Sequence, residues 1–294
     1  MREISTHLSA FTSTLSAVEE KAFAEYWQNY RAKRKAGDPF SLPPLERPYW
    51  MLLPDWLLRR NPEKRESLED ILVAQYYLFL AFRIHDDLLD DGSRHPQALK
   101  SIPAALFIEA KNMFSRLFPP SSIFWSRYGE SISETTDAIA NADILQNSPT
   151  TSPERLLDEY ARINSVFLVG SWAACVLTGR FEDFECVKSF ADDLSRGAQV
   201  LDDYYDMKED LMRGKYNYVA NMLMRSTHQT ASQVPSMERR FIEESLDKIL
   251  LFIEQCYQTA YEKLETLEIT ESSQFAEEYI KRIEMIREDQ PHFF

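Results

Sequence analysis

Long stretches of this sequence are apolar on nearly every side and have the length of helices. One runs from Ser67 to Asp91, and its interior, Ile71 to Phe82, contains a single polar residue, Gln75. A helix that is apolar all round is expected to be surrounded by other helices rather than to lie on a surface. The stretch from Pro153 to Leu177 has a similar core, and the stretch from Glu185 to Arg213 carries apolar residues at helical spacing. The pattern predicts buried helices of an all-helical protein.

Amphipathic segments and their terminators complete this pattern. Further helical or apolar segments are predicted at Ala17 to Lys35, Tyr49 to Leu58, Ser101 to Phe118, Ile123 to Asn141, Val219 to Met224, Arg239 to Leu267 and Ser273 to Glu288. Glycines follow the helical patterns where a left-handed cap is expected, namely Gly37, Gly92, Gly179 and Gly214. Gly197 lies inside a predicted helix at a cost of about 1 kcal/mol relative to Ala, which predicts close approach of another helix or a ligand. We expect one all-α domain spanning residues 1 to 294.

The charge and the cysteines restrict the partners and the compartment. The net charge of −14 disfavours nucleic acid and anionic membrane surfaces, because both require a basic face. The 3 cysteines form no paired framework, which is typical of buried thiols in a reducing compartment. We find no signal-peptide pattern and no uninterrupted apolar window of about 18 residues. The sequence therefore predicts a cytoplasmic protein without stable membrane insertion.

The first candidate for chemistry is an acidic cluster at the end of the Ser67 to Asp91 stretch. Asp86 and Asp90 share one helix face, and Asp87 and Asp91 share another. Like charges four residues apart repel, and no Lys or Arg stands four residues downstream of Asp86 or Asp87 to offset them. Oxygen ligands suit Mg²⁺, which joins one or two carboxylates to the phosphate oxygens of a substrate. Taken alone, the cluster is compatible with a magnesium site and with a solvated acidic helix end.

A second acidic cluster changes the balance between these two interpretations. Near the end of the Glu185 to Arg213 stretch, Asp202, Asp206 and Asp210 repeat every four residues, and Gly214-Lys215 follows. We expect the two acidic helix ends to face each other across a shared cavity. Together, Asp86-Asp87-x-x-Asp90 and Asp202-Asp203-x-x-Asp206 resemble the two aspartate-rich motifs of the trans-isoprenyl diphosphate synthases, a family of class I isoprenoid synthases.

The resemblance implies a helical bundle around a central active-site cavity, a family-typical homodimer and a set of site residues. About three Mg²⁺ ions would bind the carboxylates of Asp86, Asp87, Asp90, Asp202 and Asp206. The substrate diphosphate would contact Arg47, Arg94, Arg162, Gln199 and Lys215, although the usual Lys-Thr pair near Arg162 is absent. The residues acting directly in catalysis would be Asp86, Asp87, Asp90, Asp202 and Lys215, because metals and basic groups stabilise a leaving diphosphate. The pocket would include Phe79, Phe82, Phe167 and Ala198, with ordinary core packing an equal alternative for Phe167.

The sequence departs from this family where chain-elongating members bind isopentenyl diphosphate. Their signature Gly-Gly-Lys-x-x-Arg-Pro corresponds here to residues 42–48, which keep Arg47-Pro48 but have Pro44 at the lysine position. Phe79 stands where family members have Gln or His, and the paired arginines after the first motif are reduced to Arg94-His95. An anionic co-substrate without these partners would bind poorly.

We therefore interpret the sequence as a Mg²⁺-dependent terpene synthase, a cyclase or lyase, built on the isoprenyl diphosphate synthase scaffold. It would ionise one allylic prenyl diphosphate to a carbocation and release diphosphate. Substrates of ten to fifteen carbons are favoured over twenty, because the bulky Phe82 lies where family members shorten the pocket with aromatic residues. Two alternatives stay open: a chain-elongating prenyltransferase that condenses an allylic diphosphate with isopentenyl diphosphate, and a non-catalytic partner subunit of such an enzyme.

Overall fold

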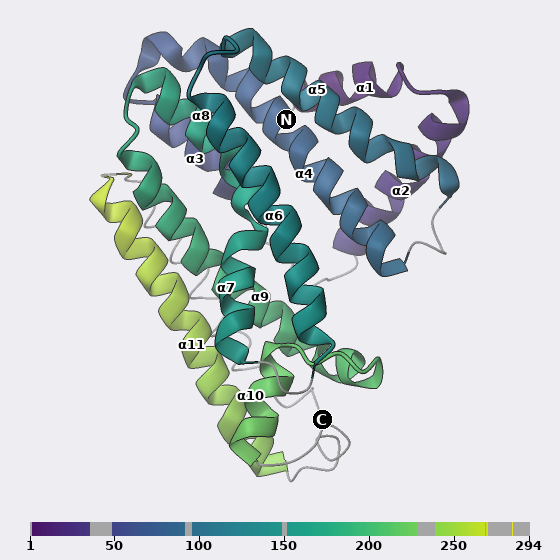
Figure 1. Cartoon of the computed structure of the whole chain (residues 1–294), viewed down its shortest axis with the longest axis vertical. Coiled ribbons are helices and arrows are strands. Elements are labelled where there is room, and N and C mark those ends of the chain that lie inside the picture. The colour runs from purple at the N-terminus through teal and green to yellow at the C-terminus, as the bar shows by residue number, and fades with distance from the viewer. Residues whose placement is uncertain are drawn as a thin grey trace. The chain divides into compact units, whose positions relative to one another are not determined.

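The computed structural model of the chain consists of α-helices joined by turns and short 3-10 helices in the residues it describes, which are 2–35, 49–91, 96–148, 152–227, 239–267, 269 and 284 (Figure 1). The chain divides into two compact units. The first comprises Met1–Tyr128 and Val169–Phe181, and the second comprises Gly129–Leu168 and Glu182–Phe294. The interpretation of the chain as a single domain stays a prediction.

The first unit is built around helix α4, Leu68–Asp91. Helix α4 packs against α5, Ile102–Leu117, and against α3, Tyr49–Leu58, and α8, Val169–Thr178. Figure 1 shows α4 and α5 side by side. Buried residues cover most sides of α4, whereas Tyr76 and Phe79 are only half-buried. The buried residues are Ile71, Leu72, Val73, Ala74, Gln75, Tyr77, Leu78, Leu80, Ala81, Phe82 and Ile84. The predicted burial of this apolar stretch is therefore confirmed.

The amino-terminal helices and one buried amide complete the first unit. Helices α1, Arg2–Thr12, and α2, Ala17–Lys35, precede the core, and Tyr77 of α4 donates a hydrogen bond to the carbonyl of His7 in α1 (2.9 Å). The buried Gln75 side chain accepts a hydrogen bond from the backbone N–H of Gly170 in α8 (2.6 Å). The one polar residue inside the apolar stretch thus satisfies a buried donor of a neighbouring helix.

The second unit is built around helix α9, Asp183–Met212. It packs against α11, Arg239–Thr266, and also against α7, Pro153–Ile163, and α10, Tyr218–Thr227 (Figure 1). A Cβ added at Gly197 of α9 would lie only 2.7 Å from Cε1 of Tyr257 and 3.2 Å from Cβ of Cys256, both in α11. The close approach predicted at Gly197 is confirmed, and its cause is a neighbouring helix.

The prediction of one continuous helix from Pro153 to Leu177 is wrong. Helix α7 ends at Ile163, a 3-10 helix follows at Ser165–Leu168, and α8 begins at Val169. At the break, the backbone N–H of Val166 donates to the buried hydroxyl of Thr135 in α6, Phe124–Gln146 (2.9 Å). A side chain from another helix therefore satisfies this donor, which the apolar pattern along the chain does not reveal.

The predicted glycine caps are confirmed where the structure describes them. Gly179 and Gly214 have φ angles of 70° and 76°, in the left-handed region that suits glycine after a helix. Gly37 and Gly92 lie outside the described residues, as does the helix expected at Ser273 to Glu288 apart from residue 284.

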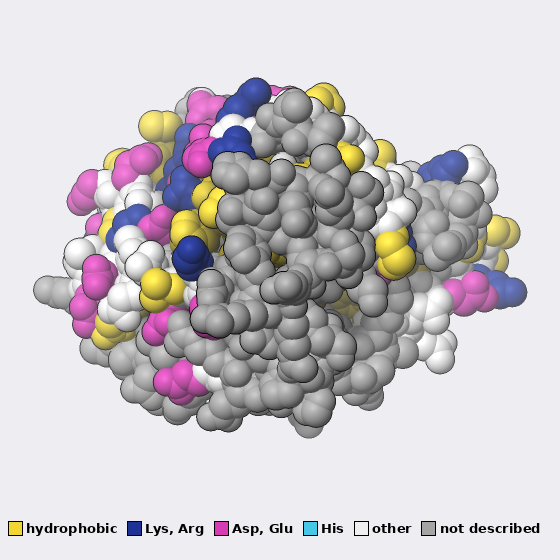
Figure 2. All heavy atoms as spheres, turned by 90° about the horizontal axis from the view of Figure 1, so that it is seen from below, with side chains coloured by type: hydrophobic (Ala, Val, Ile, Leu, Met, Phe, Trp, Pro, Cys, Tyr) yellow, Lys and Arg dark blue, Asp and Glu magenta, His cyan; other side chains and the backbone are white. Residues whose placement is uncertain are grey.

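The surface and the hydropathy of the described segments bear on possible membrane contact. In the face drawn in Figure 2, described basic and acidic side chains lie interspersed with one another. One stretch, Pro153–Thr178, is long and apolar enough to cross a membrane by length and composition, and 61% of its apolar window is buried inside the protein. Core helices of water-soluble proteins meet the same criterion, so this stretch is weak evidence for a membrane span.

Candidate functional site

The first acidic motif lies in the last turns of α4, in the first unit. The side chain of Asp86 is 42% exposed, whereas that of Asp87 is 22% exposed. The side chain of Asp90 lies outside the described residues. Asp87 is held from two directions, because its Oδ2 accepts from the hydroxyl of Tyr26 in α2 (2.6 Å) and its Oδ1 accepts from Nη2 of Arg83 (2.8 Å).

Arg83 is a part of this site that the sequence reasoning missed. Its Nη1 also lies 3.5 Å from Oδ2 of Asp86, so one guanidinium reaches two carboxylates of the motif. Burial alone would lower the pKa of Arg83, but the Asp87 and Asp86 carboxylates outweigh burial and raise it. The signal was present in the sequence, since Arg83 precedes Asp86 and Asp87 by three and four residues, the spacing at which helix side chains meet.

Tyr26 had no comparable local signal. It lies 61 residues before Asp87 and meets it only through the packing of α2 beside α4. Burial, followed by the hydrogen bond to Asp87, raises the pKa of Tyr26, so this phenol stays protonated and acts as a donor.

Aromatic side chains surround the part of α4 that precedes the motif. Phe79 stacks on Trp50 of α3, with ring centroids 5.0 Å apart, and also packs against Tyr76 (6.0 Å). Phe82 is buried and meets Phe107 of α5 edge-on at 5.2 Å. Both predicted pocket residues of this unit thus have apolar ring contacts.

The second acidic motif lies in α9, in the second unit, and its two adjacent aspartates differ in environment. Asp202 and Asp206 are exposed, whereas Asp203 is 6% exposed. Oδ2 of Asp203 accepts from the hydroxyl of Tyr160 in α7 (2.7 Å) and from the backbone N–H of Tyr218 in α10 (2.7 Å). Burial raises the pKa of Asp203 well above its ordinary value, against these hydrogen bonds, which favour the ionised form. Asp203 therefore joins three helices and leaves Asp202 and Asp206 at the surface of the unit.

The turn after α9 is fixed by the same network. Asn217 donates to the carbonyl of Asp203 (3.0 Å) and to Oδ2 of Asp210 (2.8 Å). The backbone N–H of Lys215 donates to the carbonyl of Asp210 (2.8 Å), and its Nζ lies 4.0 Å from Oδ1 of Asp143 in α6. Burial raises the pKa of Asp210, and Asn217 acts in the opposite direction. Asp210, although it continues the spacing of four, supports the turn that presents Lys215.

The remaining predicted residues are distributed as follows. Gln199, Asp202 and Asp206 follow one another along one face of α9, and Ala198 and Gln199 are half-buried. Arg162 lies in the last turn of α7, where its Nη1 donates to Oε2 of Glu159 (2.9 Å). Phe167 lies half-buried in the 3-10 helix Ser165–Leu168. Arg47 and Arg94 lie outside the described residues.

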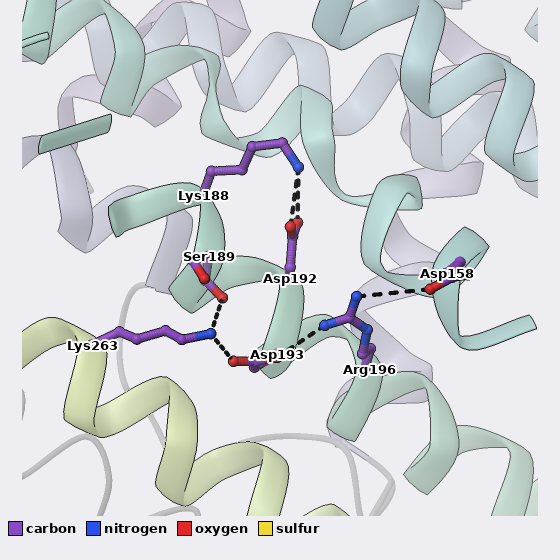
Figure 3. Close-up of polar contacts among 7 residues, drawn as sticks. All are labelled: Asp158, Lys188, Ser189, Asp192, Asp193, Arg196 and Lys263. Carbon is purple, nitrogen blue, oxygen red and sulfur yellow. Dashed lines mark hydrogen bonds and ion pairs between the residues drawn. The ribbon is translucent and has the colours of Figure 1, made fainter. Parts of the chain in front are cut away.

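A further pair of adjacent aspartates in α9 provides a contrast with the second motif. Lys188 donates to Asp192 (3.0 Å), and Asp193 accepts from Arg196 (2.9 Å) and from Lys263 of α11 (Figure 3). Burial raises the pKa of Asp192, against the nearby Lys188. Both carboxylates are thus paired with basic side chains of their own unit, and the contact of Asp193 with Lys263 joins α9 to α11.

The donor chemistry of both motifs fits Mg²⁺. Within the part of the chain that the structure describes, no three His, Cys, Asp or Glu side chains gather into a ready metal-binding group. The described carboxylates of both motifs nevertheless offer oxygen donors that water reaches, namely those of Asp86 and Asp87 on α4 and of Asp202 and Asp206 on α9. Such donors match a hard cation that keeps several waters.

Comparison with known proteins defines the fold. No protein-family model matches the sequence, and no curated protein matches it. The structure is similar to the crystal structure of a decaprenyl diphosphate synthase from Rhodobacter capsulatus, with a TM-score of 0.68, 13% identity and coverage of 96% of each chain. The chain therefore has the all-α fold of the isoprenyl diphosphate synthases, as the two motifs predicted.

Proposed function

We propose that the protein is a Mg²⁺-dependent terpene synthase that ionises one allylic prenyl diphosphate and releases diphosphate. The observation that carries the choice of a terpene synthase is the environment of Phe79. Chain-elongating enzymes of the resembled family have Gln or His at this position, and here the position is an aromatic ring stacked on Trp50 at 5.0 Å. A side chain packed in this way offers no hydrogen bond to a second diphosphate, and leaving a phosphate charge without partners is costly.

The proposed chemistry assigns the polar residues to the leaving group. Bound Mg²⁺ would supply the positive charge that stabilises the departing diphosphate. The carboxylates of both motifs would hold that charge, namely Asp86, Asp87, Asp90, Asp202 and Asp206. Arg162, Gln199 and Lys215 would bind and orient the diphosphate oxygens, because fixed donors stabilise developing negative charge better than water does. Asp203 would act only through α9, by fixing the helix that carries Asp202 and Asp206.

The apolar residues would serve the carbocation. Phe82 lies one turn before Asp86 on α4 and is fixed by its edge-on contact with Phe107. An aromatic face stabilises a cation without reacting with it, and buried apolar walls exclude the water that would quench it. The bulk of Phe82 supports substrates of ten to fifteen carbons. Phe79, Phe167 and Ala198 are proposed as further pocket residues.

A chain-elongating prenyltransferase is the second candidate function. It is favoured by the structural similarity, over 96% of both chains, to a protein described as a decaprenyl diphosphate synthase. In that case Arg47, Arg94 and one of Arg59 or Arg60 would bind the second diphosphate. Arg59 already donates to Asp55 (3.0 Å), so it would have to change partner. A non-catalytic partner subunit is disfavoured, since the sequence keeps both motifs.

The test is incubation of the purified protein with Mg²⁺ and geranyl or farnesyl diphosphate, with and without isopentenyl diphosphate. Volatile hydrocarbons or alcohols formed without isopentenyl diphosphate would support the terpene synthase. Longer diphosphates formed only with it would contradict this proposal and support elongation. Asp86→Ala should abolish either product, whereas Asp137→Ala, which removes an exposed carboxylate of α6, should not.

We further propose a cytoplasmic location and a homodimer, the latter to be checked by light scattering.

A further inference from the structure

The first acidic motif already contacts a cation of its own chain. The guanidinium of Arg83 donates to Oδ1 of Asp87 at 2.8 Å and lies 3.5 Å from Oδ2 of Asp86. The other oxygen of Asp87 accepts from Tyr26 at 2.6 Å. Both oxygens of Asp87 therefore have protein donors, and the Arg83 guanidinium reaches Asp86 as well as Asp87.

This arrangement places Arg83 in competition with any metal ion at the motif. A divalent cation that binds Asp86 or Asp87 would lie within a few ångströms of the guanidinium, where two positive charges repel. The Arg83 side chain is 43% exposed, and ion pairs with that much exposure are held weakly enough to exchange. A guanidinium that leaves a carboxylate remains a fork of donors, and this fork also matches phosphate oxygens.

We propose that Arg83 is an exchangeable counter-cation: it offsets part of the negative charge of the first motif in the metal-free protein, yields Asp86 and Asp87 to a divalent cation, and then binds a diphosphate oxygen. This inference rests on the proposed function and adds to it a residue that limits metal affinity and raises diphosphate affinity. Tyr26 keeps Asp87 attached to α2 while Arg83 changes partner. No bond is made or broken in this exchange.

The first arm of the test measures metal binding without substrate. Mn²⁺ is titrated into the wild-type protein and into Arg83→Gln, and free Mn²⁺ is read by electron paramagnetic resonance. We expect Arg83→Gln to bind Mn²⁺ about three- to tenfold more tightly, the range that the loss of one partly exposed ion pair allows. Arg116→Gln is the matched control, because it removes the same charge from the same unit at Arg116, whose Nη1 lies 3.9 Å from Asp70. Its affinity should change less than about twofold.

The second arm measures binding of inorganic diphosphate at saturating Mg²⁺ by calorimetry. Arg83→Gln should bind diphosphate about three- to tenfold more weakly, and Arg83→Lys should recover part of the loss, since it keeps the charge but not the fork. If Arg83 only stabilised the structure of α4, its replacement would weaken the binding of both the metal ion and diphosphate. Unchanged or weaker Mn²⁺ binding, or unchanged diphosphate binding, would overturn the inference.

The two proposals fail separately. Products formed by the wild-type protein, with variants that bind Mn²⁺ as the wild type does, would reject the role of Arg83 and leave the proposed function intact. Tighter Mn²⁺ binding by Arg83→Gln in a protein that forms no product would reject the proposed function alone.

Discussion

Replacement of Tyr160 by Phe tests the buried network behind the second motif. The change removes one hydroxyl, which donates to Oδ2 of Asp203 at 2.7 Å and accepts from Gln146 at 3.1 Å. The ring remains, so no large cavity forms, and the cost arises from a buried carboxyl that loses a donor. Such a loss amounts to about 2 kcal/mol of unfolding free energy. At roughly 2–4 °C per kcal/mol for a chain of this size, the melting temperature should fall by about 4–8 °C.

The chain offers a matched control for this substitution. Tyr261 of α11 also donates to a carboxylate, Oε1 of Glu265 at 2.6 Å, but this pair is exposed. Urea unfolding of Tyr160→Phe and Tyr261→Phe, followed by far-ultraviolet circular dichroism, compares the same chemical change in buried and exposed settings. We expect Tyr261→Phe to lower the free energy of unfolding by less than about 0.5 kcal/mol, because water replaces the lost partner. Equal losses in the two variants would refute the reasoning that burial makes the Asp203 network costly to disrupt.

The effect of Tyr160→Phe should also depend on pH. Burial holds the pKa of Asp203 in the folded protein well above its unfolded value, so the folded state binds the proton more tightly. Stability from this group is therefore present below the unfolded pKa of about 3.9 and is lost as pH rises through the folded pKa. The Tyr160 hydroxyl favours the ionised carboxylate, so its removal raises that pKa further. The stability difference between wild type and variant should grow from pH 5 to pH 8, and a constant or shrinking difference would contradict this assignment.

Further predictions concern the same unit. Asp203→Asn removes the buried ionisable group while its amide oxygen can accept both hydrogen bonds, so the melting temperature should vary less with pH than in the wild type. Gly197→Ala would place a Cβ 2.7 Å from the Tyr257 ring and should cost about 1 kcal/mol, since strain of roughly 1–3 kcal/mol exceeds the helix propensity gained. Gly129→Ala, whose Cβ would meet nothing within 4 Å, should be neutral or stabilising in the same thermal melts. Asp202→Ala should lower Mg²⁺-dependent product formation by at least about 100-fold with an unchanged melting temperature, and retained turnover would exclude Asp202 from the metal site.

The helices could be predicted where the sequence marks both of their ends. The apolar segment from Tyr49 to Leu58 follows a proline-rich connection, and its predicted bounds agree with those of α3. Gly214 likewise marks the end of α9, within one or two residues. The break between α7 and α8 was not predicted, because no Gly or Pro lies at the break and Asn164-Ser165 is too weak a signal to end a helix by itself. The cause is a hydrogen bond from Val166 to Thr135, residues that only the folded chain brings together.

The candidate site also has a part that helical spacing predicts and a part that depends on contacts between distant residues. Spacing alone placed the two motifs on helices, and their metal-binding role stays a prediction. The different environments of Asp202 and Asp203 depend on α7 and α10, from which Tyr160 and the backbone of Tyr218 reach Asp203. Helical spacing turns adjacent residues about 100° apart but does not state which side a neighbour will cover. The hydrogen bond from Tyr26 of α2 to Asp87 could not be predicted either, because the two residues are 61 positions apart and meet only in the folded chain.

The separation of Asp202 from Asp203 has a consequence for how this chain would change over evolutionary time. If selection for the reaction were relaxed, substitutions at the exposed Asp202 and Asp206 would cost less folding stability than a substitution at Asp203, which is buried and bonded to α7 and α10. Asp203 would be retained, because the packing of those helices depends on it. A homologue that keeps the second aspartate of this motif but has lost the first would therefore be recognisable as a folded protein that has abandoned the chemistry.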